Sequence, residues 1–173
     1  PASFNQEKLE WINQSYIKST NINNLVENLK WHLNNLNINL DNGPSIYELA
    51  ESLRERSGSL VDMAQSCVMF YCDFEAFDSV QANKVFNTKS RPILEDLVVN
   101  LNLIDSWTDK NIHSVIKIVC EKNDVGFGQV GQPFRLALSG DGKSGSIDVS
   151  AEFVGKERTL ARLEKAIDWI NKL

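Results

Sequence analysis

Apolar residues recur along most of this chain with the period of an α-helix. The segment 45–57 shows the pattern most simply, because its apolar residues fall at positions i, i+3, i+4 and i+7: Ile46, Leu49, Ala50 and Leu53. The same spacing predicts further helices at 5–19, at 21–36, from residue 60, from residue 93, after Thr108 and from about Lys156. Strand patterns are scarce, so the sequence predicts an all-α fold.

Residues that begin and end helices stand where the apolar period requires them. Ser59 and Asp62 have the spacing of a capping box before one helix, and Thr108 is placed to cap another. Pro92 suits the first turn of a helix, where a backbone N–H has no partner to lose. The run 42–44, Asn-Gly-Pro, predicts a turn.

Two stretches interrupt the helical pattern. The acidic and aromatic segment 73–82 is the expected join between two consecutive small helical subdomains, which we place at 1–75 and 76–173. The stretch 124–147 holds six of the nine glycines, and we expect an irregular region there. Since glycine lets a backbone approach its neighbour closely, this region should lie against another helix or a ligand.

Composition places the chain among ordinary globular proteins, with 42% hydrophobic and 24% charged residues. No apolar run is long enough to span a bilayer, so we expect a cytoplasmic protein without a membrane partner. The chain begins with Pro1, and its methionines are Met63 and Met69. We therefore expect a piece of a longer protein.

Charge is distributed unevenly. Residues 1–88 hold 6 Lys or Arg against 11 Asp or Glu, whereas residues 89–173 hold 12 of each, and the net charge is −5. General binders of polyanions are usually basic. Any contact with nucleic acid should therefore come from a local patch, mostly in the second half.

Motifs that resemble catalytic or cofactor sites lack the context that they need. Residues 126–131 spell GxGxxG, but no strand precedes them, so a dinucleotide site is not expected. The three cysteines, Cys67, Cys72 and Cys120, and the two histidines show no metal-ligand spacing. We expect buried thiols, structural or surface histidines, and no catalytic residue, metal or cofactor.

Several arginines and lysines are candidates for contacts with RNA. Arg158, Arg162, Lys165 and Lys172 follow the last predicted helix, either as a solvated face or as an RNA-facing stripe. Arg56 and Arg135 lie near breaks in the helical pattern, where a planar guanidinium can meet a base edge or a phosphate.

Six blocks taken together resemble the C-terminal region of bacterial glutamyl-tRNA synthetases, in the same order and over essentially the whole chain. The most specific block is GQVGQPFRLALSG at 128–140. The others lie at 4–17, 31–33, 42–44, 63–74 and 155–163. The family's HIGH-like and KMSKS-like ATP motifs and its cysteine-based zinc knob have no counterpart in this sequence.

The resemblance implies a helical region that reads the anticodon loop of tRNA(Glu) and is joined to a catalytic domain in the same polypeptide. That whole enzyme would use ATP and Mg²⁺ to attach glutamate, while this region would only bind, as a monomer. Arg56 would contact the third anticodon base. Contacts to the first two bases would come from four positions: Gln132, Arg135, Ser144 and Ile147. The family often has Thr at the position of Ser139 and sometimes Thr-Pro at 144–145, so the contacts at 144–147 are the less secure ones.

A different class of function is a helical scaffold that binds other proteins. The aromatic residues Phe74 and Phe77 in the join would then form an exposed anchor patch.

Overall fold

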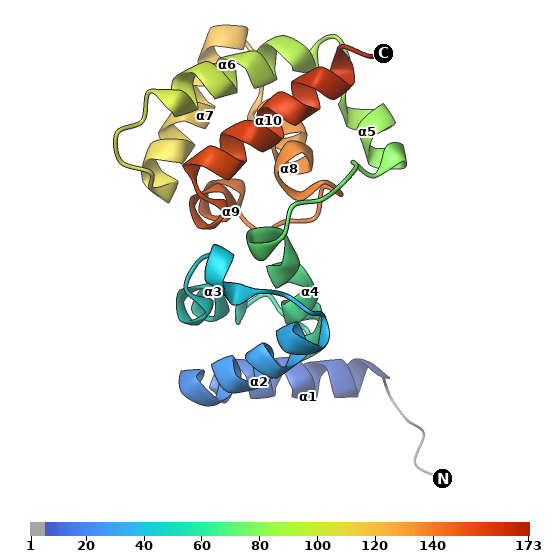
Figure 1. Ribbon diagram of the computed structural model, residues 1–173, viewed down its shortest axis with the longest axis vertical. Helices are drawn as coiled ribbons and strands as arrows, with labels where there is room; N and C mark the ends of the chain where they lie inside the picture. Colours follow the sequence, from blue (N-terminus) through green and yellow to red (C-terminus); the bar gives the residue numbers. More distant parts are fainter. Residues whose placement is uncertain (1–5) are drawn as a thin grey trace. The chain divides into compact units, whose positions relative to one another are not determined.

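The computed structural model describes residues 6–173, without the side chains of Gln6, Glu7 and Glu10. This part of the chain forms ten α-helices, a short 3₁₀ turn (η1, Leu40–Asn42) and no strand (Figure 1). The helices are α1 Gln6–Ser19, α2 Ile22–Asn35, α3 Ile46–Leu53, α4 Leu60–Tyr71, α5 Ser79–Val85, α6 Ser90–Asn102, α7 Asp109–Asn123, α8 Phe127–Ser139, α9 Ile147–Val154 and α10 Lys156–Ile170. The all-α prediction is confirmed.

Contacts divide the chain into a first unit, Pro1–Asp73, and a second unit, Phe74–Leu173. From the sequence we placed the join after residue 75. Among the described residues, no helix is long and apolar enough to cross a membrane.

The first unit is built around α2, which packs against α3 and α4. Its leucines and their partners on the other two helices are completely buried, as the apolar period predicted: Leu25, Leu29, Leu33, Leu49, Met63 and Cys67. The turn between α2 and α3 is held by Tyr71, whose hydroxyl donates to the carbonyl of Pro44 at 2.9 Å. Gly43 lies under the same ring, where a Cβ atom would come within 2.2 Å of Tyr71 Cδ1.

The second unit packs α10 against α6 and α8, and α7 against α8 and α9 (Figure 1). Its interior is lined by aliphatic residues from all of these helices: Leu94, Leu97, Leu101, Ile112, Ile116, Val130, Ala137, Ala151, Leu163 and Ala166. The predicted helix starts are confirmed at Ser59, whose hydroxyl accepts from the N–H of Asp62, and at Thr108, whose hydroxyl accepts from the N–H of Asn111. Pro92 lies in the first turn of α6.

The expected irregular region at 124–147 is wrong for most of its length, because α8 occupies 127–139 despite two glycines and Pro133. Packing decides this outcome. Val130, Phe134 and Ala137 fall at i, i+4 and i+7 and are completely buried, and burial of such a face outweighs poor intrinsic helix propensity. Only the residues around 124–126 and 140–146 are irregular.

The alternative in which Phe74 and Phe77 form an exposed anchor patch disagrees with the structure. Phe77 is 8% exposed and stacks between Phe74 and Phe86, with ring centroids 5.1 Å apart in both pairs. Phe86 in turn contacts Trp169 of α10. These rings therefore close the interior of the second unit.

Two of the four cations considered on the last helix, Arg162 and Lys165, are used inside the second unit, whereas Lys172 is exposed beyond the end of α10. Arg162 is 4% exposed and donates from Nη1 to the carbonyl of Leu138 at 2.7 Å. Lys165 donates to the carbonyls of Phe74 and Glu75 at 2.6 and 2.9 Å, with its ammonium 4.6 Å from the Phe74 ring centre. Neither a solvated face nor an RNA-facing stripe describes these two cations, because Arg162 bonds to α8 and Lys165 bonds to the segment that begins the unit.

Candidate nucleic-acid interface

Helix α8 carries two of the candidate residues on the face opposite its packed side. Gly128, Gln132, Arg135 and Ser139 fall at i, i+4, i+7 and i+11, which places them in one row along the helix. Gly128 and Gln132 are exposed, and Arg135 and Ser139 are half-buried, whereas Val130, Phe134 and Ala137 are in the core. We call this row the outer face of α8. The fold therefore holds Gln132 and Arg135 one turn apart, facing the same way.

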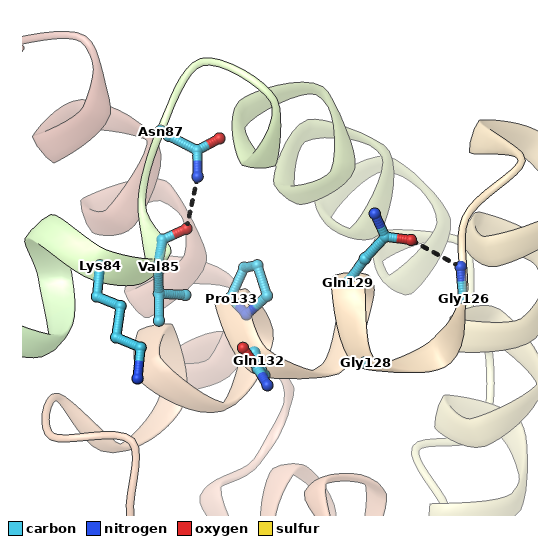
Figure 2. A pocket seen from close by; sticks show the side chains of 8 residues that line it. All are labelled: Lys84, Val85, Asn87, Gly126, Gly128, Gln129, Gln132 and Pro133. Atoms are coloured by element: carbon cyan, nitrogen blue, oxygen red, sulfur yellow. Dashed lines mark hydrogen bonds between the residues drawn. The ribbon is translucent and has the colours of Figure 1, made fainter.

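The start of α8 is closed by a side chain of the helix itself. The backbone N–H of Gly126 donates to Gln129 Oε1 at 3.0 Å, so the amide oxygen of Gln129 is engaged and its NH₂ group points outward (Figure 2). Gly128 lies beside it, and an added Cβ there would meet nothing within 4 Å. The first turn of α8 is thus open on its outer side.

A pocket of about 430 Å³ lies at this turn, between α5 and α8 (Figure 2). Lys84, Val85 and Asn87 form one side of the pocket, and Gly126, Gly128, Gln129, Gln132 and Pro133 form the other. Gln132 is the one lining residue that the sequence identified. The others were missed, although the GxGxxG run already indicated a backbone with open space beside it.

The end of α8 fixes the loop that follows. Ser139 Oγ donates to the carbonyl of Arg135 and accepts from the N–H of Gly142, both at 2.9 Å. Gly140 ends the helix in the left-handed region (φ 81°), donates its N–H to Leu136 and accepts from the N–H of Asp78. This loop, residues 140–146, leads directly from the outer face of α8 to Ser144.

Two candidate residues present buried polar atoms without a partner. In the described part of the chain, Arg135 Nε and Ser144 Oγ are both inaccessible and make no hydrogen bond. The only other such side-chain atom is Arg54 Nε. Buried polar groups in folded proteins are nearly always paired, so a small local movement that exposed Arg135 Nε or Ser144 Oγ to a ligand would give each of them a partner.

Ile147 differs from the other candidates, because its side chain is 2% exposed and belongs to the core. A ligand could reach only its backbone, at the first residue of α9, where helix N–H groups lack partners within the helix.

The start of α9 is anchored by Asp148. Its carboxylate accepts hydrogen bonds from Ser146 Oγ and from the backbone N–H of Val149. The carboxylate also lies 3.0 Å from His113 Nδ1 on α7. Burial alone would raise the pKa of Asp148, but these hydrogen bonds outweigh burial and lower it. Asp148 therefore stays ionised and holds the residues that flank Ile147.

Arg56 lies in the first unit, in the turn between α3 and α4. Its N–H donates to the carbonyl of Leu53 at 3.0 Å, and the next residue, Ser57, donates to the same carbonyl from both N–H and Oγ. The backbone of Arg56 is therefore fixed, while its side chain is exposed and makes no hydrogen bond or ion pair with the described residues.

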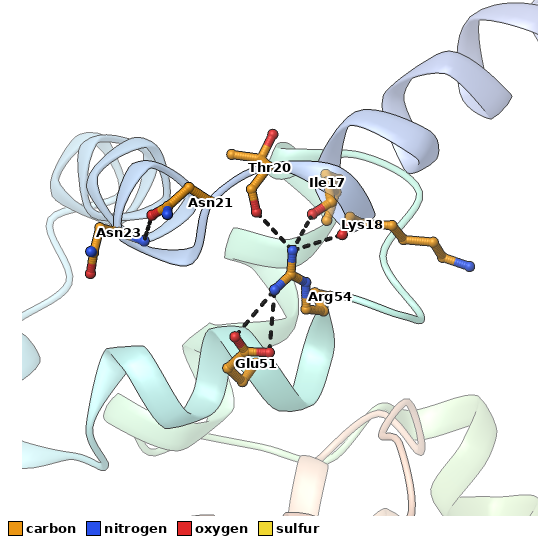
Figure 3. Close-up of polar contacts among 7 residues, drawn as sticks. All are labelled: Ile17, Lys18, Thr20, Asn21, Asn23, Glu51 and Arg54. Atoms are coloured by element: carbon orange, nitrogen blue, oxygen red, sulfur yellow. Dashed lines mark hydrogen bonds and ion pairs between the residues drawn. The ribbon is translucent and has the colours of Figure 1, made fainter.

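Arg54, two residues earlier, has a side chain that is bonded inside the first unit (Figure 3). Its Nη2 atom donates to the carbonyls of Ile17, Lys18 and Thr20 at 3.2, 2.8 and 2.8 Å, and Nη1 contacts Glu51 at 3.2 Å. These carbonyls end α1, so Arg54 ties α1 to α3. Arg54 is structural, and Arg56 is available for a ligand.

The described residues contain no group of three or more His, Cys, Asp or Glu side chains placed to hold a metal ion. The three cysteines are free thiols. Cys67 is completely buried as expected, and burial raises its pKa to about 12, whereas Cys72 and Cys120 are only partly buried.

Comparison with known proteins gives one consistent family. A family model described as an anticodon binding domain matches residues 24–167. Two curated relatives are glutamate–tRNA ligases, from Vesicomyosocius okutanii subsp. Calyptogena okutanii (strain HA) and Ruthia magnifica subsp. Calyptogena magnifica. They are 49% and 47% identical over 168 residues, which cover 97% of this chain and 36% and 37% of the relatives.

A solved structure agrees with these relatives. A glutamate tRNA ligase from Elizabethkingia meningosepticum CCUG26117, determined in complex with its amino acid, superimposes with a TM-score of 0.84 at 25% identity. The match covers 96% of this chain and 33% of that one. The chain thus spans about a third of the length of the curated relatives that it matches.

Proposed function

The chain belongs to the anticodon-binding domain family, and on that premise we propose that it binds the anticodon loop of tRNA(Glu). It would do so as part of a longer glutamate–tRNA ligase, whose catalytic domain attaches glutamate with ATP and Mg²⁺ in the cytoplasm. The part described here supplies binding, as a monomer, and no chemical step.

The two unpaired polar atoms carry this proposal. Of three such side-chain atoms in the described residues, two belong to Arg135 and Ser144, the positions at which the resemblance implies contacts with anticodon bases. Proteins read RNA sequence mainly at loops, where unstacked bases expose their edges to hydrogen bonds. An arginine held on a packed helix, with one donor already desolvated, suits such a base edge.

Charge supports base contacts rather than broad contact with the RNA backbone. The net charge is −5, and Arg162 and Lys165 are engaged inside the second unit. Few phosphates can be neutralised, so affinity should come from a small number of polar contacts and should be modest for the chain alone.

The test is titration of a fluorescent tRNA(Glu) anticodon stem-loop at low salt with the 173-residue chain and with Arg135→Ala. Removal of the guanidinium should weaken binding by about 1–3 kcal/mol and reduce discrimination against stem-loops with a changed anticodon. Arg56→Ala should act at a different anticodon position.

Arg91→Ala is the matched control, because Arg91 is an exposed arginine of α6 whose ion pair within the described residues is with Glu95. If Arg91→Ala weakened binding as much as Arg135→Ala, or if every anticodon variant bound equally well, base reading by Arg135 would be excluded.

A further inference from the structure

The pocket at the start of α8 continues the face that carries Arg135. Gln132 lines the pocket and also lies one turn before Arg135 on the outer face of α8, so a strand of RNA that passes Arg135 can run into the pocket. The volume of about 430 Å³ lies within the range of small-ligand sites, about 300–1,000 Å³.

Gly128 has no reason in the fold to be glycine. Its backbone is helical, its φ is not in the left-handed region, and an added Cβ would meet nothing within 4 Å. Glycine is also a poor helix former. Since Gly128 lines the pocket, the missing side chain keeps this space open.

Lys84 gives the pocket its charge. This residue is exposed in the last turn of α5 and forms no ion pair with the described residues. Across the pocket, the Gln129 NH₂ group remains free to donate, because only its oxygen is used by Gly126. Gln132 is exposed and offers both a donor and an acceptor (Figure 2).

Asn87, by contrast, is part of the frame. Its side-chain oxygen accepts from the N–H groups of Lys89 and Ser90, and its NH₂ group donates to the carbonyl of Val85. The pocket therefore combines one exposed cation, two neutral amides and a stretch of backbone without a side chain at Gly128. A cation suits a phosphate, amides suit the edge of a base, and bare backbone allows a flat ring to approach closely.

We propose that this pocket holds one nucleotide of the RNA loop next to those contacted by Gln132 and Arg135, with its phosphate at Lys84, its base edge at Gln129, Gln132 at the border between the two nucleotides, and Gly128 leaving it room. This inference rests on the proposed function and adds residues and a nucleotide to it.

The first arm of the test measures salt dependence. The affinity of the 173-residue chain for the tRNA(Glu) anticodon stem-loop is followed against salt concentration for wild type, Lys84→Ala and Lys117→Ala. Lys117 is an exposed lysine of α7 outside the pocket, so its replacement removes the same charge elsewhere. Loss of one phosphate contact should reduce the slope of log affinity against log salt by about 0.7, and only for Lys84→Ala.

The second arm fills the pocket. Gly128→Leu should weaken binding about tenfold, whereas Ser114→Leu, at an exposed position of α7, should not. Stem-loops lacking one loop base at a time then identify the nucleotide, since wild type should lose affinity for one of them and Gly128→Leu should be insensitive to that same loss. Circular dichroism checks that Gly128→Leu is folded, and if it is not, the Lys84 arm decides alone.

The outcomes separate the two proposals. If wild type binds and Arg135→Ala does not, while Lys84→Ala and Gly128→Leu behave like their controls, the pocket is not a nucleotide site and the proposed function stands. If wild type fails to bind the stem-loop at any salt concentration, the proposed function is lost and the pocket inference with it.

Discussion

Two arginines two residues apart differ in their surroundings, because Arg54 is bonded inside the fold whereas Arg56 has an exposed side chain that the proposed function uses. Arg54 neutralises carbonyls at the C-terminal end of α1, where the helix dipole is negative, and its side chain is 16% exposed. Arg56 stands on a fixed backbone with a free side chain. Sequence alone could not separate the two, because both lie at the end of the same helix and the carbonyls come from more than 30 residues away.

Arg54→Ala should therefore destabilise the chain, whereas Arg56→Ala should not. Loss of charge-assisted hydrogen bonds to three carbonyls should lower the free energy of unfolding by about 1.5–3 kcal/mol. Replacement of the exposed Arg56 should change it by less than about 0.5 kcal/mol. Urea unfolding followed by circular dichroism measures both variants, and equal losses would refute the assignment of separate roles.

Gly140 is required for two independent reasons, and its neighbour Gly142 for one. Both have left-handed backbone, φ 81° and 78°, which costs a residue with a Cβ about 1–2 kcal/mol. A Cβ at Gly140 would in addition lie 2.8 Å from Phe74 Cγ, whereas at Gly142 its nearest neighbour would be Leu136 Cδ1 at 3.9 Å.

Gly140→Ala should consequently lower the free energy of unfolding by about 1–3 kcal/mol more than Gly142→Ala does, since only the first displaces a packed ring. Thermal unfolding of the two variants provides the comparison. Similar losses would mean that Phe74 moves aside without cost.

At the scale of elements, the sequence predicted helices well where local signals and burial agree. The caps at Ser59 and Thr108 and the apolar face of α3 are local features, and the structure has them. Helix α8 was missed because glycines and a proline argue against a helix locally, while much of the packing that stabilises it comes from α5, α6 and α10, which are not its neighbours in the chain.

The candidate site divides in a similar way. The outer face of α8 with Gln132 and Arg135 follows from helical periodicity once the helix is known. The burial of Arg162 and of the Ile147 side chain does not, because each depends on a partner or a neighbour brought near only by folding. Lys84 and Gln129 were missed for the same reason, since the pocket joins segments about 45 residues apart.

The start of α9 should be sensitive to acid. The pKa of Asp148 is lower in the folded chain than its ordinary value of 3.8, so its ionised form contributes stability above that pH. This contribution is lost as the pH falls through the folded pKa. Asp148→Asn should lower the free energy of unfolding by about 1–2 kcal/mol at pH 7, and the difference from wild type should shrink toward zero as the pH falls below 3.8.

Denaturant unfolding between pH 7 and pH 2.5 measures this difference. Asp109→Asn is the matched control, because Asp109 also lies in the first turn of a helix but contacts no histidine. If the difference in unfolding free energy between wild type and Asp148→Asn did not change with pH, the charge of the carboxylate would make no contribution to stability.

At the scale of the whole molecule, each unit has an interior of its own. The second unit contains the contacting rings of Phe77, Phe86 and Trp169, the buried Arg162 and all the helices from α6 to α10 that pack around them. Residues 74–173 alone should therefore fold, with a helical circular dichroism spectrum and a single cooperative thermal transition. They should also keep the RNA contacts that depend on Arg135 and lose those that depend on Arg56. A fragment without a cooperative transition would contradict this independence.

The two faces of α8 have a consequence for how specificity can change. Since Val130, Phe134 and Ala137 fix the helix from inside, the outward positions 128, 132 and 135 are less constrained by folding, whereas Ser139 holds the loop that follows. Randomising positions 128, 132 and 135 in a library should yield mostly folded proteins, with altered preferences among RNA loop sequences. Under the proposed function, such substitutions would change which anticodon loop the chain prefers while the buried face of α8 keeps the fold.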